Sequence, residues 1–168
     1  MGIAHADIND DGRVDLYVTN FSQESNTLYL SQPDGGFSDE TRAAGLRAPS
    51  FALLGFGTQF LDADNDGLHD LLVLNGHIDE FKGQDYRMRP QLFRGLPGRR
   101  FVEATGTAAG AWFAEPRLGR GLATLDWNGD GKLDFVASDL EGPFALGTNR
   151  TSAQNRSLRV KLVGGPRS

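Results

Sequence analysis

The sequence contains no cysteine, only three histidines and no long apolar run. Without cysteine the chain has no disulfide, no thiolate nucleophile and no zinc–thiolate site, although this leaves its redox compartment open. No apolar stretch approaches the ~18 residues that suggest a membrane-spanning helix. A net charge of −5 without a basic stripe argues against a nucleic acid partner.

Motifs of common enzyme classes are also missing. There is no serine or cysteine in a nucleophile elbow, no histidine pair at zinc spacing and no glycine-rich phosphate loop. His77, with Asp79 and Glu80 close by, is the one candidate for acid–base chemistry. We expect His77 to pack in or cap the turn after a strand, His5 to lie on an inner strand, and His69 to point away from its loop. The sequence therefore predicts no enzyme.

Three copies of one acidic nine-residue pattern are the main positive signal. The copies are DINDDGRVD from Asp7, DADNDGLHD from Asp62 and DWNGDGKLD from Asp126. Each has Asp at positions 1, 5 and 9, Asp or Asn at position 3 and Gly at position 6, and a hydrophobic run follows. Gly at position 6 permits a tight curl because it adopts positive φ without steric cost.

This pattern predicts one calcium ion in each loop. Calcium takes about six to eight oxygen ligands from carboxylates, amides, backbone carbonyls and water. Positions 1, 3, 5 and 9 offer side-chain oxygens, and position 7 offers its carbonyl. The predicted ligands are Asp7, Asn9, Asp11, Arg13 and Asp15 in the first loop, Asp62, Asp64, Asp66, Leu68 and Asp70 in the second, and Asp126, Asn128, Asp130, Lys132 and Asp134 in the third.

The loops have two other possible interpretations. An EF-hand needs a Glu at position 12 between two helices, but position 12 here is Val18, Val73 or Ala137, within β-rich runs. Plain hairpin turns rich in Asp, Asn and Gly remain the alternative to calcium loops. Because the second loop has four carboxylates and the others three, we expect the second site to bind calcium most tightly.

The repeat extends beyond the loops and predicts the fold. A glycine stands five residues before each loop, and NTLYLSQPDGGFSDET from Asn26 matches PQLFRGLPGRRFVEAT from Pro90 at an offset of 64. A period of this length built from short strands is typical of a propeller blade. We expect an all-β propeller with about three four-stranded antiparallel blades, at about 1–46, 47–110 and 111–154. The strands expected in the middle blade are Phe56–Leu61, Asp70–Leu74, Gln91–Leu96 and Arg100–Ala104. Apart from one helical turn near Thr41–Ala44, no helix is expected.

Three segments resemble a known family. They are DLYVTNFSQESNTLYL from Asp15, LLVLNGHID from Leu71 and NRSLRVKLVG from Asn155. The units resemble FG-GAP/VCBS-type β-propeller repeats, and more closely those of the ASPIC/UnbV group, related to cartilage acidic protein. Residues 155–168 are similar to the start of the domain that follows the propeller in that group.

The resemblance implies a calcium-stabilised scaffold, extracellular or periplasmic, for adhesion to or recognition of a protein or glycan. Calcium would be structural. The competing function is a polysaccharide lyase or hydrolase built on the propeller. Closed propellers have about 4–8 blades, so three blades suggest an internal piece of a longer protein whose remaining blades are partners. Assembly of several copies into a ring is the alternative.

Two further groups of side chains have open roles. We expect the arginines of a local basic cluster to be solvated outer-strand residues, with a polyanion or acidic glycan site as the alternative. Trp112, Phe113 and Trp127 either fill the space between blades or stack on sugars. The arginines of the cluster are Arg87, Arg89, Arg94, Arg99 and Arg100.

Overall fold

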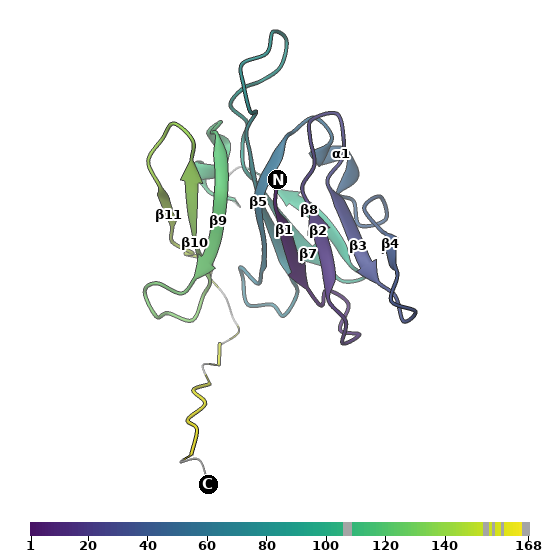
Figure 1. Ribbon diagram of the computed structural model, residues 1–168. Helices are drawn as coiled ribbons and strands as arrows, with labels where there is room; N and C mark the ends of the chain where they lie inside the picture. The colour runs from purple at the N-terminus through teal and green to yellow at the C-terminus, as the bar shows by residue number, and fades with distance from the viewer. Residues whose placement is uncertain (106–108, 153–154, 156, 159, 166–168) are drawn as a thin grey trace.

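A computed structural model describes residues 1–105, 109–152, 155, 157–158 and 160–165, and these form three separate antiparallel sheets (Figure 1). No described sheet closes on itself. The prediction of an all-β fold with propeller-like blades is therefore confirmed. The third sheet has three strands in the described part of the chain, where four were expected.

Each sheet follows chain order from its first strand outward. The first contains β1 (Ile3–Ala6), β2 (Asp15–Val18), β3 (Thr27–Ser31) and β4 (Phe37–Asp39). The second contains β5 (Gly55–Leu61), β6 (Asp70–Asn75), β7 (Gln91–Leu96) and β8 (Arg100–Ala104). The third contains β9 (Gly119–Leu125), β10 (Asp134–Asp139) and β11 (Ala145–Gly147). In the second sheet, β7 and β8 match the predicted strands. β5 begins one residue before its predicted start, and β6 ends one residue after its predicted end.

The expectation that the linkers contain no helix was wrong. A short helix, α1, spans Arg47–Ser50, and a 3-10 helix, η2, spans Ala111–Ala114, whereas Thr41–Ala44 forms a turn. Ser50 stabilises α1 because its buried hydroxyl donates to the Leu46 carbonyl at 2.8 Å and accepts from the backbone N–H of Asn26 at 3.1 Å. One turn of helix is too short to show a helical period in the sequence.

The glycines before the loops allow the inner strands β1, β5 and β9 to approach closely. A Cβ on Gly2 would lie 2.5 Å from the carbonyl oxygen of Phe56, and one on Gly57 would lie 2.7 Å from that of Arg120. Backbone atoms cannot yield to such a contact, so side chains larger than hydrogen are excluded at both positions. This close approach explains why glycine recurs at these two positions before the loops, where the calcium pattern does not require it.

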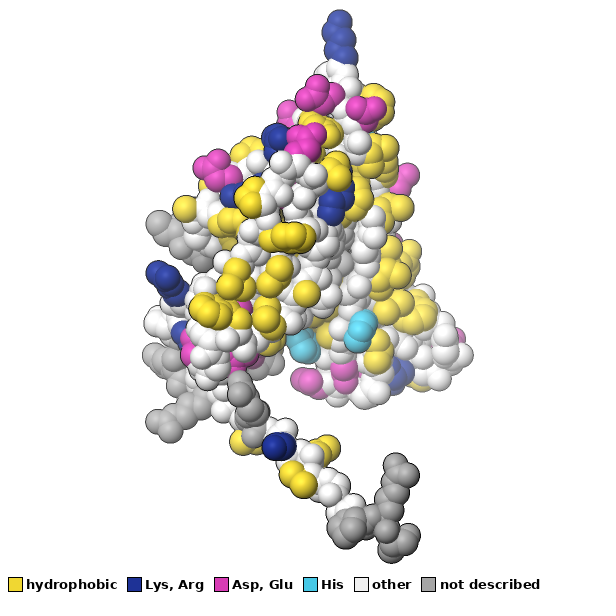
Figure 2. All heavy atoms as spheres, turned by 60° about the vertical axis from the view of Figure 1, so that its left-hand side comes forward, with side chains coloured by type: hydrophobic (Ala, Val, Ile, Leu, Met, Phe, Trp, Pro, Cys, Tyr) yellow, Lys and Arg dark blue, Asp and Glu magenta, His cyan; other side chains and the backbone are white. Residues whose placement is uncertain are grey.

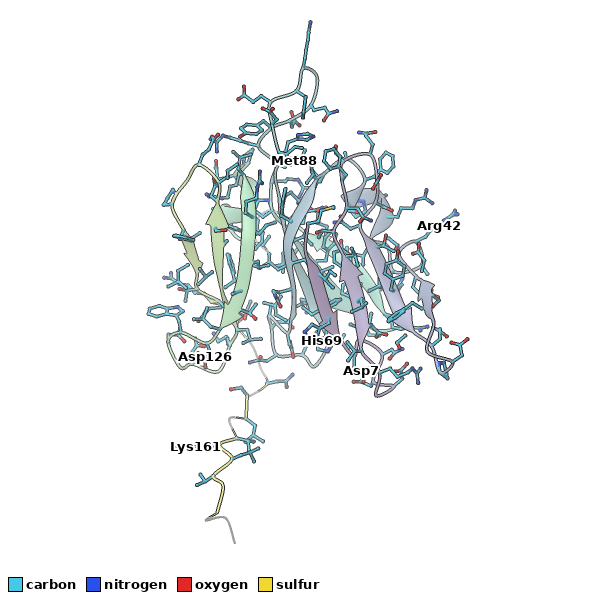
Figure 3. The ribbon with its side chains drawn as sticks, viewed as in Figure 1. Asp7, Arg42, His69, Met88, Asp126 and Lys161 are labelled. Carbon is cyan, nitrogen blue, oxygen red and sulfur yellow. The ribbon has the colours of Figure 1, made fainter. Side chains whose placement is uncertain are left out.

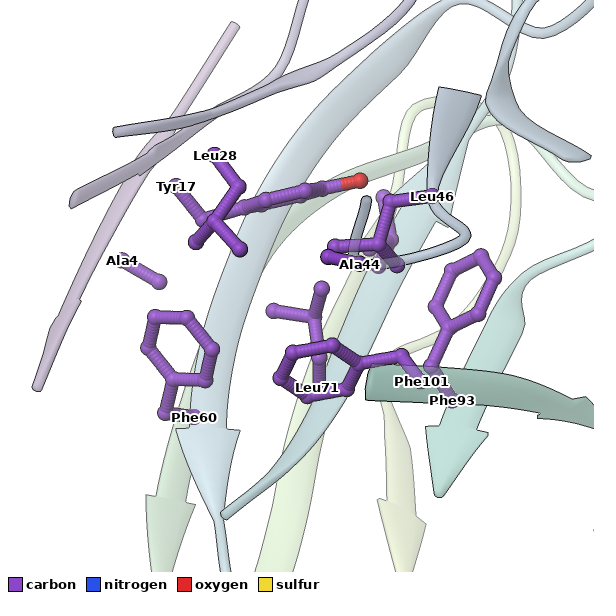
Figure 4. Close-up of a cluster of buried hydrophobic side chains, with 10 residues drawn as sticks. Ala4, Tyr17, Leu28, Ala44, Leu46, Phe60, Leu71, Phe93 and Phe101 are labelled. Carbon is purple, nitrogen blue, oxygen red and sulfur yellow. The ribbon is translucent and has the colours of Figure 1, made fainter. Parts of the chain in front are cut away.

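The main hydrophobic core lies between the first and second sheets (Figure 4). Burying one large apolar side chain contributes about 1.5–3 kcal/mol to the stability of the fold. Because both sheets contribute residues to this cluster, it holds them together as one packed unit. The cluster consists of Ala4, Tyr17, Leu28, Ala44, Leu46, Phe60, Leu71, Val73, Phe93 and Phe101.

Aromatic rings of the third repeat pack together, and Phe113 and Phe135 line one pocket with Leu72 and Leu92 of the second sheet. Trp112 and Phe113 of η2 contact Phe135 of β10, with ring centroids 4.9 and 5.9 Å apart. The packing interpretation therefore holds for these two residues. Trp127 is 52% exposed, and its Nε1 donates to the Thr148 hydroxyl at 3.2 Å. Within the described residues, neither helical segment is long and apolar enough to cross a membrane.

Candidate metal loops

All three acidic loops lie at the same end of the sheets (Figures 1 and 3). Each connects the first strand of its sheet to the second: β1 to β2, β5 to β6, and β9 to β10. Figure 3 shows Asp7 and Asp126 at this end, opposite the end that carries Met88. The repeat therefore places three equivalent candidate sites on one edge of the molecule.

Position 9 of each loop is a buried aspartate that connects the loop to the third strand of its sheet or to the segment just after that strand. In the second loop, Asp70 accepts from the backbone N–H of Ala63 at 2.9 Å and from that of Gly95 at 2.7 Å. Asp15 and Asp134 are likewise buried. The equivalent donors are Ile8 and Ser31 for Asp15, and Trp127 and Asn149 for Asp134.

From the sequence, the aspartate at position 9 has only a predicted role as a metal ligand. Its second role is to accept hydrogen bonds that connect residues far apart in the chain, such as Asp70 and Gly95. The sequence did contain a signal, because aspartate is depleted in β-strands yet occupies the first residue of β2, β6 and β10.

Position 1 curls the loop around its own carboxylate. Asp62 accepts from the N–H groups of Asp66 at 3.0 Å and Gly67 at 2.9 Å, and Gly67 has φ of +89°. Asp7 repeats the pattern with Asp11 and Gly12, and Asp126 accepts from Gly131 at 3.1 Å. Hydrogen bonds within the protein therefore direct the position-1 carboxylates into their loops without any cation.

The second loop has the most compact set of carboxylates. One oxygen each from Asp62, Asp64 and Asp70 lies within 4.8 Å of the other two, and no other acidic or histidine trio in the described part of the chain is this close. Oxygens bound to one calcium ion at about 2.3–2.6 Å lie at most about 5 Å apart. These three residues therefore fit a calcium ion.

A basic side chain lies against the second loop. The Arg94 guanidinium is 2.5 Å from Asp64 and 3.8 Å from Asp66. Burial raises the pKa of Asp70 to about 6; the N–H groups of Gly95 and Ala63 oppose this rise, and the charges of Asp64 and Asp66 add to it. The loop thus concentrates negative charge, which Arg94 partly offsets.

In the first and third loops, the position-5 carboxylates have side-chain hydrogen-bond partners that the second loop lacks among the described residues. The Asn9 amide donates to Asp11 at 2.8 Å, and the Asn128 amide donates to Asp130 at 3.2 Å. Arg13 at position 7 also pairs with Asp11. In the first loop, burial tends to raise the pKa of Asp7, but the N–H groups of Gly12 and Asp11 outweigh it and lower that pKa.

Position 7 also contributes contacts that were not expected. The N–H of Leu68 donates to Asp66 at 2.8 Å, and those of Arg13 and Lys132 donate to the position-5 carboxylates of their own loops. Lys132 also lies 3.9 Å from Asp130 through its ammonium group. The predicted role of the position-7 carbonyls as calcium ligands stays a prediction.

None of the three histidines belongs to the compact trio. His77 is 1% exposed between Phe21 and Phe81, with ring centroids 5.4 and 5.1 Å away, and its Nδ1 accepts from the Asp79 amide at 3.4 Å. The packing interpretation of His77 is therefore supported. His5 lies on β1, and His69 is exposed next to Asp70.

The match with a known family falls on the first two loops. Residues 7–73 match the family described as FG-GAP-like repeat. This segment runs from the first loop through the second loop into β6. Together with the three antiparallel sheets, the match supports a β-propeller-like scaffold of FG-GAP repeats. No curated protein matched the chain. The finer resemblance to the ASPIC/UnbV group and the bounds of the blades stay predictions.

Proposed function

We propose that this chain is a calcium-binding, β-propeller-like scaffold that serves recognition or adhesion in an extracellular or periplasmic setting. The observation that supports it best is the compact trio of Asp62, Asp64 and Asp70 on the loop between β5 and β6. A protein or a glycan is the expected partner, together with further blades of a longer parent chain.

Calcium has a structural role in this proposal. It would be held by the position 1, 3, 5 and 9 side chains of each loop, and it would neutralise three or four clustered carboxylates. Position 9 also accepts N–H groups from the end of the third strand or the segment after it, as Asp70 does from Gly95. An ion at this point would therefore stabilise the connection between the first three strands of a sheet.

A thermal melting series tests the proposal. The full chain is melted in calcium, in magnesium and in a chelator at equal ionic strength. We expect a clear rise in melting temperature with calcium and a much smaller one with magnesium, which keeps its own waters and demands octahedral geometry. Equal melting temperatures in calcium and chelator would contradict the structural role.

The competing proposal, a propeller-based carbohydrate-active enzyme, needs acids that do not ligate calcium in a central cleft. The one histidine–carboxylate candidate does not supply them, since Asp79 accepts from the Glu80 amide at 2.8 Å and His77 is enclosed by two rings. We therefore favour the scaffold over the enzyme.

A further inference from the structure

A groove separates the first acidic loop from the turn between β7 and β8. Its volume is about 390 Å³, which falls within the usual ~300–1,000 Å³ range of ligand pockets. The first repeat supplies one wall and the second repeat the other, so the groove exists only where two repeats meet. It is lined by Ile8, Asn9, Asp10, Leu68, His69, Gly95, Leu96, Gly98, Arg99, Arg100 and Phe101.

The basic cluster of the sequence divides into paired and unpaired arginines. Arg87 pairs with Glu141 at 2.6 Å, Arg94 pairs with Asp64, and Arg89 pairs with Glu103. Arg99 and Arg100 have no ion pair within the described part of the chain, and both line the groove. Within this cluster of five arginines, the two without an ion pair in the described residues are thus the two that line the groove.

The backbone conformation of Arg99 indicates that the arginine side chain has a function at this position. Arg99 has φ of +62°, a conformation that favours glycine, and at the equivalent position 64 residues earlier the chain has Gly35 with φ of +86°. The turn in the first repeat thus uses the residue that fits best, while the second repeat places an arginine there. Leu96 pairs with Arg100 in the ladder, so this turn is short and both arginines are carried on a fixed hairpin.

The remaining lining is mixed in character. Asp10 lies on the first loop, His69 lies on the second, and the partly buried Leu68 and Leu96 provide apolar surface. Arginine forks bind carboxylate and sulfate groups in a bidentate manner, while the carboxylate of Asp10 repels such groups but accepts hydrogen bonds from hydroxyls. A ligand that suits both walls carries an anionic group and hydroxyls on one compact body.

We propose that this groove binds an acidic saccharide, with Arg99 and Arg100 on its carboxylate or sulfate group and Asp10 on its hydroxyls. This proposal rests on the proposed recognition function and names its ligand class. The net charge of −5 opposes non-specific attraction of polyanions, so binding would depend on the local pair of arginines.

Calorimetric titration of the full chain in calcium buffer tests the site. The probes are a hyaluronan tetrasaccharide, which carries carboxylates only, a sulfated chondroitin tetrasaccharide, a neutral N-acetylglucosamine tetrasaccharide and an aspartate tetrapeptide. We expect binding of at least one acidic saccharide and at least tenfold weaker binding of the neutral one. The two acidic probes distinguish a carboxylate from a sulfate as the recognised group.

A double variant and a matched control locate the site. R99G/R100S is expected to bind the acidic saccharide at least tenfold more weakly with an unchanged melting temperature, because glycine suits the positive φ at position 99. R42S/R47S removes the same charge from two exposed arginines elsewhere, one of which Figure 3 labels, and should bind normally.

Three results would overturn the proposal. They are equal loss of binding in the control, equal binding of the neutral saccharide, and absence of binding to both acidic saccharides. Equal, arginine-dependent binding of the aspartate peptide would also overturn it and assign the groove to acidic peptides. Calcium uptake by R99G/R100S is measured in parallel, so failure of the groove and failure of the calcium loops are read separately.

Discussion

The second loop and the two outer loops share a backbone but treat negative charge differently. All three have the buried position-9 aspartate with two N–H donors and the position-1 carboxylate that accepts from position 6. Among the predicted side-chain ligands only the residue at position 3 differs, and the basic residues near each loop differ as well. In the outer loops an asparagine amide donates to position 5, whereas in the second loop Asp64 adds a carboxylate that Arg94 contacts.

This difference separates two functions of one sequence pattern. The shared hydrogen bonds define the shape of the loop, and the side chain at position 3 sets the charge that a cation would meet. Figure 2 shows acidic side chains at both ends of this face, and those at the lower end lie near the histidine side chains. The following predictions test this separation, from the largest expected effect to the smallest.

Removing the position-9 aspartate should destabilise every loop about equally. Asp15→Ala, Asp70→Ala and Asp134→Ala each leave two N–H groups without their acceptor, and an unsatisfied buried group costs about 1–3 kcal/mol. We expect a loss of about 2–4 kcal/mol in the free energy of unfolding, measured by urea denaturation in chelator. Asp34→Ala, in the exposed β3–β4 turn, serves as the control. A loss of unfolding free energy in only one of the three variants would contradict a structural role shared by all three loops.

Exchanging position 3 should exchange calcium affinities. Asp64→Asn is expected to weaken the tightest calcium site about tenfold, because one unit charge near a cation contributes about 1–4 kcal/mol at the dielectric constants of water and protein surfaces. Asn9→Asp should strengthen the first site by a similar factor. Calorimetric titration measures both. Unchanged affinities would show that position 3 does not set the charge the ion meets.

Asp70 should make the calcium-free chain less stable as the pH rises. Its pKa in the folded state is about 6, above the ~3.9 of an unfolded aspartate. The associated stability is therefore fully present below pH ~4 and is lost as the pH rises through ~6, an effect on the order of 1 kcal/mol. Unfolding free energies in chelator, compared between the wild-type chain and Asp70→Asn, measure it. The same slope in both would refute the assignment to Asp70.

Arg94 should compete weakly with calcium at the second loop. Arg94→Gln removes the guanidinium from Asp64, so we expect calcium to bind a few times more tightly there, and the gain to shrink at high salt because the pair is exposed. Arg89→Gln, which breaks the exposed pair with Glu103, is the control and should leave calcium affinity unchanged. A fall in affinity for Arg94→Gln would mean that the arginine supports the site.

Much of the fold could be predicted from the sequence because it depends on local repeats. The loop pattern marks where the first strand of each sheet ends and the second begins, and the offset of 64 aligns the outer strands of the first two sheets. The short helix Arg47–Ser50 could not be predicted, because it is stabilised by hydrogen bonds of the Ser50 hydroxyl, one of them from the backbone N–H of the distant Asn26.

The candidate site was predictable in its residues but not in its electrostatics. The spacing identified Asp62, Asp64 and Asp70, and the structure brings them together. The contacts of Arg94 with Asp64 and of Gly95 with Asp70 join residues 30 and 25 positions apart. Such pairs depend on the register of β7 against β6, which residue spacing within a loop does not specify.

Calcium titration of the full chain by calorimetry, at neutral pH and after chelator removal, tests the central claim most directly. We predict uptake of about three ions, with the affinity of the tightest step about tenfold weaker in Asp64→Asn and unchanged in Asn9→Ala. A folded chain that takes up no calcium, or whose tightest step has the same affinity in Asp64→Asn, would contradict the proposal.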